Sequence, residues 1–389
     1  MGYFRQCRHS KALSGICLSL IAVTVIVTLL TDYYWNRTIF KQKPLFATAT
    51  VAKKQQCEQK SNIVFVKTHK TASTSLHCIF CRYGYTNGLS FVFSKFNTQN
   101  GHLRHTPLRQ DRLLPPNGGA VVGSPSKYNI LTGHVTYSKA RIDQLMEDGA
   151  KYVTILREPA RQIESHANFF GYAGHTAEGI ASFSRDPSHF ENGGKAGSRN
   201  NQIRELGLSL SDTANETIVN KTIHKLNNEF DLVLITEYFE ESLILLKKLL
   251  CWEFEDIIYL AKNRRLERDE ITDEIRQQIY DWSRADFLLY RYFNNTLWKK
   301  IREYGSGFKD ELQKFRSYLK GTHDTCTMTQ NVQINTMNKI KHLEYSTKNQ
   351  SMSCRHLAKS AVEWFQLIAM RQYPRLSREF SLINRSKDS

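Results

Sequence analysis

A short polar segment, Lys67 to Ser75, carries the residues with the clearest chemistry. It follows Ile63 to Val66, an apolar run typical of a buried strand, and leads into a helical apolar pattern that begins near Leu76. At such a junction the backbone N–H groups and the helix dipole favour an anion, and hydroxyl groups and Lys70 add donors. The segment predicts a phosphate-binding loop, with a cluster of Ser and Thr helix caps as the alternative.

This loop contains no glycine, which separates it from two common phosphate-binding motifs. The G-x-x-x-x-G-K-[ST] pattern of kinases and NTPases and the G-x-G-x-x-G pattern of dinucleotide-binding folds are both absent. Small residues still allow the backbone to approach an anion closely. The residues predicted to bind it are Lys67, Thr68, His69, Lys70, Thr71, Ala72, Ser73, Thr74 and Ser75.

The amino-acid sequence of the loop resembles that of a known family. Lys-Thr-Ala-Ser-Thr-Ser, from Lys70 to Ser75, resembles the 5′-phosphosulfate loop of Golgi carbohydrate sulfotransferases, which use 3′-phosphoadenosine 5′-phosphosulfate (PAPS). The longer Phe65 to Ala72 string resembles the galactose 3-O-sulfotransferase family. Ser73 stands where that family often has Gly and matches the uronyl 2-O-sulfotransferases instead. The resemblance implies PAPS as co-substrate, with Lys70 stabilising the charge that develops on the leaving phosphate.

A second motif lies further along the chain. The apolar run Tyr152 to Leu156 leads into Arg157, and Ser165 stands eight residues later on the expected next helix. In sulfotransferases an Arg and a Ser in these places hold the 3′-phosphate of PAPS. A guanidinium offers a charge-assisted grip, and a hydroxyl two helical turns on can reach the same group. The resemblance implies that the two motifs bind opposite ends of one nucleotide.

Sulfuryl transfer also needs a base for the proton of the sugar hydroxyl. His134, in Gly133-His134-Val135 after an apolar run, resembles the catalytic histidine of the 2-O-sulfotransferases and is the predicted base. Histidine suits the role because its charge changes near neutral pH. The alternatives are a structural histidine at a strand end, and His69 as the base. No metal is expected, because the histidines lack zinc-ligand spacing and no D-x-D stands at a strand end.

Other stretches resemble the same family. They are Phe230 to Glu237, Tyr292 to Trp298, and Ser198 to Asn200 with Leu206 to Leu208. The resemblance covers about residues 60 to 320. It implies the P-loop NTPase-like sulfotransferase fold, an α/β fold with a parallel sheet flanked by helices.

The residue pattern agrees with that fold. Further strands are predicted at Tyr128 to Leu131, Tyr152 to Leu156 and Asp231 to Ile235, with helices from Pro159 towards Phe170 and from Tyr238 to Leu250. Strands that alternate with helices indicate a parallel sheet. Residues 171–198, rich in Gly, Ser and His, predict a mobile surface loop. We expect a catalytic domain over residues 61–320 and a helical extension of unknown role over 321–389.

The N-terminus predicts the compartment. Three basic residues in 1–11 precede the uncharged, apolar stretch Ala12 to Leu30, long enough to cross a bilayer as a helix. Basic residues before such a span favour a cytosolic tail. A cleaved signal peptide is the alternative. The expected arrangement is a single-pass type II Golgi membrane protein, with a transmembrane anchor over 12–30, a lumenal stem over 31–60 and a lumenal catalytic domain.

Sequons and cysteines fit a lumenal chain. The N-x-[ST] triplets begin at Asn36, Asn215, Asn220, Asn294, Asn349 and Asn384. Six cysteines follow the anchor, and six allow fifteen pairings between which the sequence does not choose. Cys78 and Cys81 have thioredoxin-type spacing but lie inside a predicted helix, which favours structural cysteines over a redox pair.

The composition and net charge indicate which classes of binding partner suit the protein. The 389 residues include 54 Lys and Arg against 37 Asp and Glu, a formal charge of +17, with 41% hydrophobic residues. This excludes a disordered chain and suits anionic partners such as a nucleotide or a sulfated glycan. No nucleic-acid-binding signature is present, so nucleic acid is not expected.

Three functions remain open from the sequence. The first is a galactose 3-O-sulfotransferase that acts on galactosylceramide or galactose-terminated glycans at the Golgi membrane. The second is a uronyl 2-O-sulfotransferase, favoured by Lys70 to Ser75 and by Gly133-His134-Val135. The third is a non-catalytic lumenal glycan-binding protein. A homo-oligomer is compatible with each of them.

Overall fold

The computed structural model describes residues 57–95, 108–116, 127–170, 179–191, 198–261, 264–265, 269–334 and 341–374. All of them belong to one compact unit, Cys57–Ser389. Within these ranges no helix is both long and apolar enough to cross a membrane. The predicted tail and anchor, and the stem as far as residue 56, lie outside the described residues.

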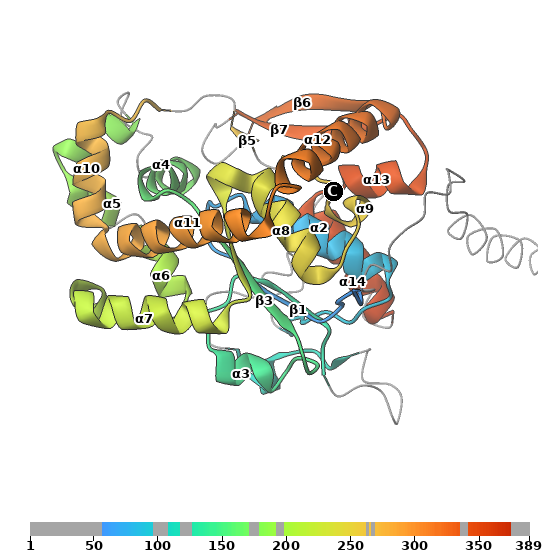
Figure 1. The fold of residues 1–389 in the computed structure, drawn as a ribbon, viewed down its shortest axis with the longest axis horizontal. Helices are drawn as coiled ribbons and strands as arrows, with labels where there is room; N and C mark the ends of the chain where they lie inside the picture. The colour runs from blue at the N-terminus through green and yellow to red at the C-terminus, as the bar shows by residue number, and fades with distance from the viewer. Residues whose placement is uncertain are drawn as a thin grey trace, which may run out of the picture. The chain divides into compact units, whose positions relative to one another are not determined.

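A four-stranded parallel sheet forms the centre of this unit (Figure 1). Its strands are β1 (Ile63–Val66), β2 (Ile130–Gly133), β3 (Lys151–Leu156) and β4 (Leu232–Ile235), in the order β2-β1-β3-β4. Nearly every strand residue is buried, which explains the continuous apolar runs in the sequence. The expected α/β class and parallel sheet are confirmed. The second strand begins two residues later than predicted, because Tyr128 makes only an isolated bridge to Met146.

The strand order places the predicted motifs at one edge. The carboxyl ends of parallel strands share an edge, so the segments after β1, β2 and β3 begin close together. Those segments are the phosphate loop, His134 and Arg157. Because β2 pairs with one side of β1 and β3 with the other, the chain reverses direction across the sheet here. Ligands bind at such switch points in open α/β sheets.

Helices flank the sheet. Those that follow the strands are α2 (Ser73–Thr86), α3 (Lys139–Asp143), α4 (Pro159–Phe170) and α8 (Phe239–Leu250). The predicted helix at Pro159 to Phe170 is confirmed at both ends. The others are α5 (Pro187–Glu191), α6 (Asn201–Glu205), α7 (Glu216–Glu229), α9 (Phe254–Ile257), α10 (Asp273–Trp282), α11 (Arg284–Tyr304), α12 (Phe308–Thr325), α13 (Met352–Ala358) and α14 (Ala361–Gln372).

The C-terminal extension differs from the helical prediction. It contains a hairpin of β6 (Met328–Ile334) and β7 (Lys341–Thr347), and β5 (Arg264–Arg265) pairs with β7. The prediction was wrong here because β6 consists mostly of polar residues and its Val332 is exposed, so no buried face marks a strand.

The last helix of the extension shares the core of the sheet domain. Helix α14 packs on α2, which begins at the phosphate loop. Gln372 accepts a hydrogen bond from the backbone N of Phe91 at 2.8 Å and donates one to its carbonyl oxygen at 2.9 Å. Trp364 and Ile368 pack in the same cluster as Cys78 and Cys81.

The structure describes residues 179–191 and 198 of the segment predicted as a mobile loop over 171–198. A 3₁₀ helix, Gly179–Ser184, and α5 lie within it. Phe183 and Phe190 are fully buried there, with ring centroids 5.1 Å apart, and pack near α10. For residues 179–191 the loop prediction was wrong, because the Gly, Ser and His content hides two aromatic anchors.

The described cysteines form two disulfides, Cys57–Cys251 and Cys326–Cys354. Cys78 and Cys81 are buried thiols within α2. Burial raises the pKa of the Cys81 thiol well above its ordinary value, which keeps it protonated. The expectation that this pair lies inside a helix is confirmed, and a raised pKa is the opposite of what a reactive redox thiol needs.

Candidate active site

The phosphate loop has a backbone shape suited to an anion. Lys70 and Ala72 adopt left-handed backbone conformations, with φ of 62° and 59°, and α2 begins at Ser73. Alternation between right- and left-handed residues turns successive N–H groups into one concavity. The first turn of α2, described in full, holds no acidic residue. The loop therefore has the backbone shape of an anion-binding nest without the glycines that usually adopt this conformation, and its binding of an anion stays a prediction.

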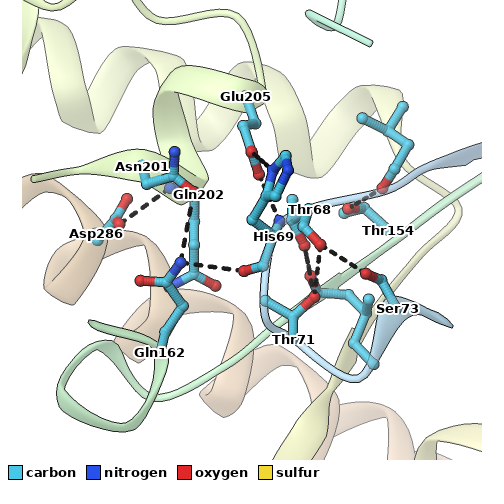
Figure 2. A network of polar contacts seen from close by, with 12 residues as sticks. Thr68, His69, Thr71, Ser73, Thr154, Gln162, Asn201, Gln202, Glu205 and Asp286 are labelled. Atoms are coloured by element: carbon cyan, nitrogen blue, oxygen red, sulfur yellow. Dashed lines mark hydrogen bonds and ion pairs between the residues drawn. The ribbon is translucent and has the colours of Figure 1, made fainter. Parts of the chain in front are cut away.

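Three hydroxyl groups hold the loop in this shape (Figure 2). Those of Thr68 and Thr71 lie 2.8 Å apart, and Ser73 donates a hydrogen bond to the Thr68 carbonyl oxygen at 2.6 Å. All three residues are buried. Their part in nucleotide binding stays a prediction, and the structure gives their side chains a shaping role.

Ala72 offers a direct test of the loop shape. Its side chain is exposed, so a larger residue meets no steric block, but a β-branched residue strains a left-handed backbone. We expect Ala72→Val to destabilise the protein by about 1–2 kcal/mol and to weaken binding of 3′-phosphoadenosine 5′-phosphate (PAP). Ala72→Gly is the matched control and should keep both. Denaturant unfolding and calorimetry measure these effects, and equal behaviour of the two variants would refute the strained nest.

The two predicted nucleotide motifs meet. Arg157 donates a hydrogen bond from Nη1 to the carbonyl oxygen of Lys70 at 3.1 Å. Thr236, directly after β4, donates to the carbonyl oxygen of Thr71 at 2.8 Å and to that of Leu156 at 2.9 Å. The loop after β1 is therefore tied to the ends of β3 and β4. That one ligand contacts both Lys70 and Arg157 stays a prediction, and this contact agrees with it.

Ser165 lies on α4, on the helix face that looks toward the loop. It is three residues after Gln162, which donates to the His69 carbonyl oxygen at 3.0 Å, and four before Phe169, which lies under the Lys70 ammonium. Residues at this spacing share one helix face. The role of Ser165 on the 3′-phosphate stays a prediction, and its placement agrees with it.

Lys67 lies beneath the loop. Its side chain is buried, and burial lowers the pKa of its ammonium group, against the thiols Cys78 and Cys81, which act to raise it. The amine lies within electrostatic range of these α2 thiols. Lys70 is half-buried and so is the more accessible of the two loop lysines. Lys67 as a nucleotide ligand stays a prediction.

Helix α6 positions both halves of the site, and sequence reasoning missed it. The Gln202 amide accepts a hydrogen bond from the Arg157 backbone N and donates one to the Arg157 carbonyl oxygen, both at 2.9 Å. The Glu205 carboxylate accepts from the His69 backbone N at 2.8 Å and contacts His69 Nδ1 (Figure 2). The sequence offered one signal for this helix, the two stretches that resemble the family and flank it, one ending at Asn200 and one beginning at Leu206. These stretches bracket α6 but do not indicate which of its side chains have a role.

Asp286 of α11 in turn holds α6. Its carboxylate accepts from the backbone N of Gln202 at 3.0 Å and of Ile203 at 2.8 Å, while Asn200 accepts from the Asp286 backbone N at 3.2 Å. These bonds satisfy N–H groups that a helix start leaves without partners. Burial raises the pKa of Asp286 to about 7, against the backbone hydrogen bonds that lower it.

This raised pKa predicts a pH dependence of stability. The folded chain holds the Asp286 proton up to about pH 7, whereas the unfolded chain releases it near the ordinary value of 3.8. The free energy of unfolding should therefore fall as pH rises between these values, by at most about 1.4 kcal/mol per pH unit. Asp286→Asn should flatten this slope in urea unfolding, with exposed Asp281→Asn as the control. An unchanged slope in Asp286→Asn would contradict the assignment.

Two histidines share the edge of the sheet. The rings of His69 and His134 are stacked, with centroids 3.8 Å apart. The side chain of Glu205, only 3% exposed, orients the His69 ring through Nδ1. A carboxylate that holds an imidazole fixes its tautomer and its orientation, as in hydrolase triads. His134 as the base stays a prediction, and the structure gives the rival His69 a carboxylate partner.

Ligand-type atoms of His69, His134 and Glu205 lie within 4.8 Å of one another. These are residue types that bind transition metals. Here His69 Nδ1 already meets the Glu205 carboxylate, and the two rings face each other. The geometry is that of a hydrogen-bonded imidazole against a second ring. The expectation that no metal takes part stays a prediction.

The described sequons differ in accessibility. Asn215 and Asn220 are exposed on α7, where Asn215 caps the helix. Asn349 donates a hydrogen bond to the Thr325 carbonyl oxygen at 3.0 Å. Asn294 lies within α11, with its amide oxygen buried. Asn36 and Asn384 lie outside the described residues, and glycosylation at all six stays a prediction.

The chain is similar in sequence to several sulfotransferases. It is 30% identical over 274 residues to galactosylceramide sulfotransferase of Mus musculus, covering 68% of this chain and 63% of that protein. It is 34% identical over 263 residues to the Homo sapiens protein of the same name, covering 64% and 60%. With human galactose-3-O-sulfotransferase 2 it shares 29% identity over 277 residues, 68% of each chain. The chain thus matches less than two thirds of the length of the first two relatives.

A family model described as galactose-3-O-sulfotransferase matches residues 2–351. The match covers the phosphate loop, Arg157, the histidine pair and α6, the parts that meet at one edge of the sheet. It ends before α14. The chain therefore belongs to the galactose-3-O-sulfotransferase family.

Proposed function

We propose that this protein transfers the sulfuryl group of PAPS to the 3-hydroxyl of a galactose residue on a glycolipid or glycan, with galactosylceramide as the leading acceptor. The observation that carries the proposal is the contact of Arg157 with the Lys70 carbonyl oxygen. It brings two anion-binding groups from separate strands to one place, as a nucleotide with phosphates at both ends requires. Family membership and the named relatives supply the acceptor.

The residues present fit PAPS. The nest at Lys70 to Ser75 and the N-terminus of α2 suit the 5′-phosphosulfate, and Arg157 with Ser165 suits the 3′-phosphate. When bound, PAPS supplies an activated sulfuryl group. Gln202 holds the backbone of Arg157, and the guanidinium already donates a hydrogen bond to the Lys70 carbonyl oxygen, so the side chain is partly positioned before the ligand binds.

In the proposed transfer, the bond from sulfur to the phosphate oxygen breaks as a bond from sulfur to the galactose oxygen forms. Lys70 places its ammonium near the phosphate oxygen that gains charge. His134 takes the proton of the 3-hydroxyl, and Glu205 keeps the stacked His69 ring in place through Nδ1. The protein contributes positioning and charge stabilisation, as in phosphoryl transfer.

Acceptor profiling tests the function. The full chain is incubated with ³⁵S-labelled PAPS and, separately, galactosylceramide, lactose and desulfated heparan. We expect label on the two galactosides and, after linkage analysis, at the 3-position. Label on heparan alone would replace the proposal with uronyl 2-O-transfer, which the Lys70 to Ser75 string favours. PAP binding without transfer to any acceptor would support a non-catalytic glycan-binding protein.

The cellular setting is part of the proposal. We propose a type II Golgi membrane protein with its sheet domain in the lumen, supported by the apolar stretch Ala12 to Leu30 and the sequons. The water-soluble nucleotide PAPS and a galactolipid in the membrane would then meet at the lumenal face. We expect the sheet domain to be protected from added protease in intact Golgi vesicles. Digestion of the sheet domain in these vesicles would contradict the proposed topology.

A further inference from the structure

Two adjacent phenylalanines are exposed at the end of α4, beside the histidine pair. Phe169 is 43% exposed and Phe170 is 46% exposed. The Phe170 ring lies 6.2 Å from the His69 ring and 4.6 Å from the His166 ring, between centroids. A single exposed apolar side chain needs no explanation, but two aromatic rings next to proposed reacting groups do.

The two rings have different neighbours. The Lys70 ammonium lies 3.7 Å from the centroid of Phe169, a cation–π contact. Phe169 therefore faces the nucleotide half of the site. Phe170 meets Phe169 edge to face, with centroids 5.1 Å apart, and stands on the histidine side. The aromatic pair thus extends from the loop lysine to His69, the ring that stacks on the proposed base His134.

Helix α4 fixes this placement. Gln162 and His166 precede Phe169 and Phe170 on the loop-facing side of the same helix, while Ala160 and Ala167 are buried on its other side. Figure 1 shows α4 beside α10, against which that second side packs. The phenylalanines therefore do not belong to the hydrophobic core. Contact with a ligand would explain their exposed position at the site.

We propose that Phe170 is the acceptor platform, on which the apolar face of the galactose ring stacks. This inference rests on the proposed function. In β-galactose the axial 4-hydroxyl leaves the hydrogens of C3, C4 and C5 together on one face, and aromatic rings present a negative face to such hydrogens. A galactose stacked on Phe170 lies next to the His69–His134 pair, and its 3-hydroxyl belongs to the stacked edge of the sugar.

The same ring could in principle meet an alkyl chain of a lipid acceptor, and the two occupants give different results. A sugar platform acts on every galactoside, soluble or lipid-linked. A lipid contact acts on galactosylceramide alone. The proposal commits to the sugar because Phe170 lies beside the imidazoles that the reacting hydroxyl must approach.

The test uses the full chain and steady-state kinetics with lactose and with galactosylceramide. Phe170→Ala should raise KM for both acceptors by about 3- to 10-fold, the loss of one aromatic contact. Phe170→Trp should keep KM near wild type, and Phe170→Leu, apolar but without a ring, should behave as Phe170→Ala. Binding of PAP by calorimetry should stay unchanged in all three. Met370→Ala, 45% exposed on α14, is the control and should change nothing.

Three results would overturn the platform: an unchanged KM in Phe170→Ala, a raised KM for galactosylceramide alone, or full rescue by leucine. Failure of the proposed function looks different. There the wild-type chain would bind PAP but form no sulfated galactoside, whereas failure of the platform leaves wild-type transfer intact.

Discussion

Replacing Lys70 by alanine is expected to lower kcat by about 10²- to 10³-fold, the usual cost of removing one group that stabilises developing charge. Lys70 is half-buried in the loop, and its backbone carbonyl oxygen accepts from Arg157. The substitution keeps this carbonyl, so the loop should hold its shape. Initial rates of ³⁵S transfer at saturating acceptor measure the loss.

Lys314→Ala is the matched control, because Lys314 is exposed on α12. It should transfer at the wild-type rate. Lys70→Arg should recover only part of kcat, since a guanidinium places its charge differently from an ammonium group. A Lys70→Ala variant with wild-type kcat would remove Lys70 from the transfer step.

Replacing His134 by alanine is expected to lower kcat by about 10²- to 10⁴-fold while PAP binding is kept. The imidazole follows β2 and stacks on His69, outside the loop that meets the nucleotide. Loss of the proton acceptor should also remove the acidic limb of the pH–rate profile. Rates across pH and calorimetry with PAP separate the two effects.

The rival histidine is tested in parallel. His69→Ala removes the ring that contacts Glu205 and stacks on His134, and so should lower kcat. The bonds from Glu205 and Gln162 to the backbone of residue 69 remain, so the loop and PAP binding should be kept. If His134→Ala turns over normally while His69→Ala loses its rate with PAP binding intact, the base is His69. Glu205 would then be the group that orients the base.

The sheet and the motif positions were predictable because their signals are local. The apolar runs of β1, β3 and β4 are buried on both faces, and the strand-loop-helix order around Lys70 follows from sequence alone. Parallel pairing then places their carboxyl ends at one edge, so the closeness of the segments that carry Lys70 and Arg157 follows from topology.

The supporting residues were not predictable in the same way. Gln202, Glu205 and Asp286 act through contacts that join positions far apart in the chain, such as residues 69 and 205. No periodicity marks a polar side chain that satisfies a distant backbone group. The β6–β7 hairpin was missed for a related reason, because its polar strands lack a buried stripe.

The central claim is that one pocket holds both phosphate-bearing ends of the nucleotide, with Arg157 at the 3′ end. The most direct measurement is calorimetric affinity of wild type and Arg157→Ala for PAP and for adenosine 5′-monophosphate, which lacks the 3′-phosphate. Wild type should prefer PAP by about 10- to 100-fold, the value of a charge-assisted contact, and Arg157→Ala should bind both alike. A variant that keeps the full preference for PAP would contradict the two-ended grip.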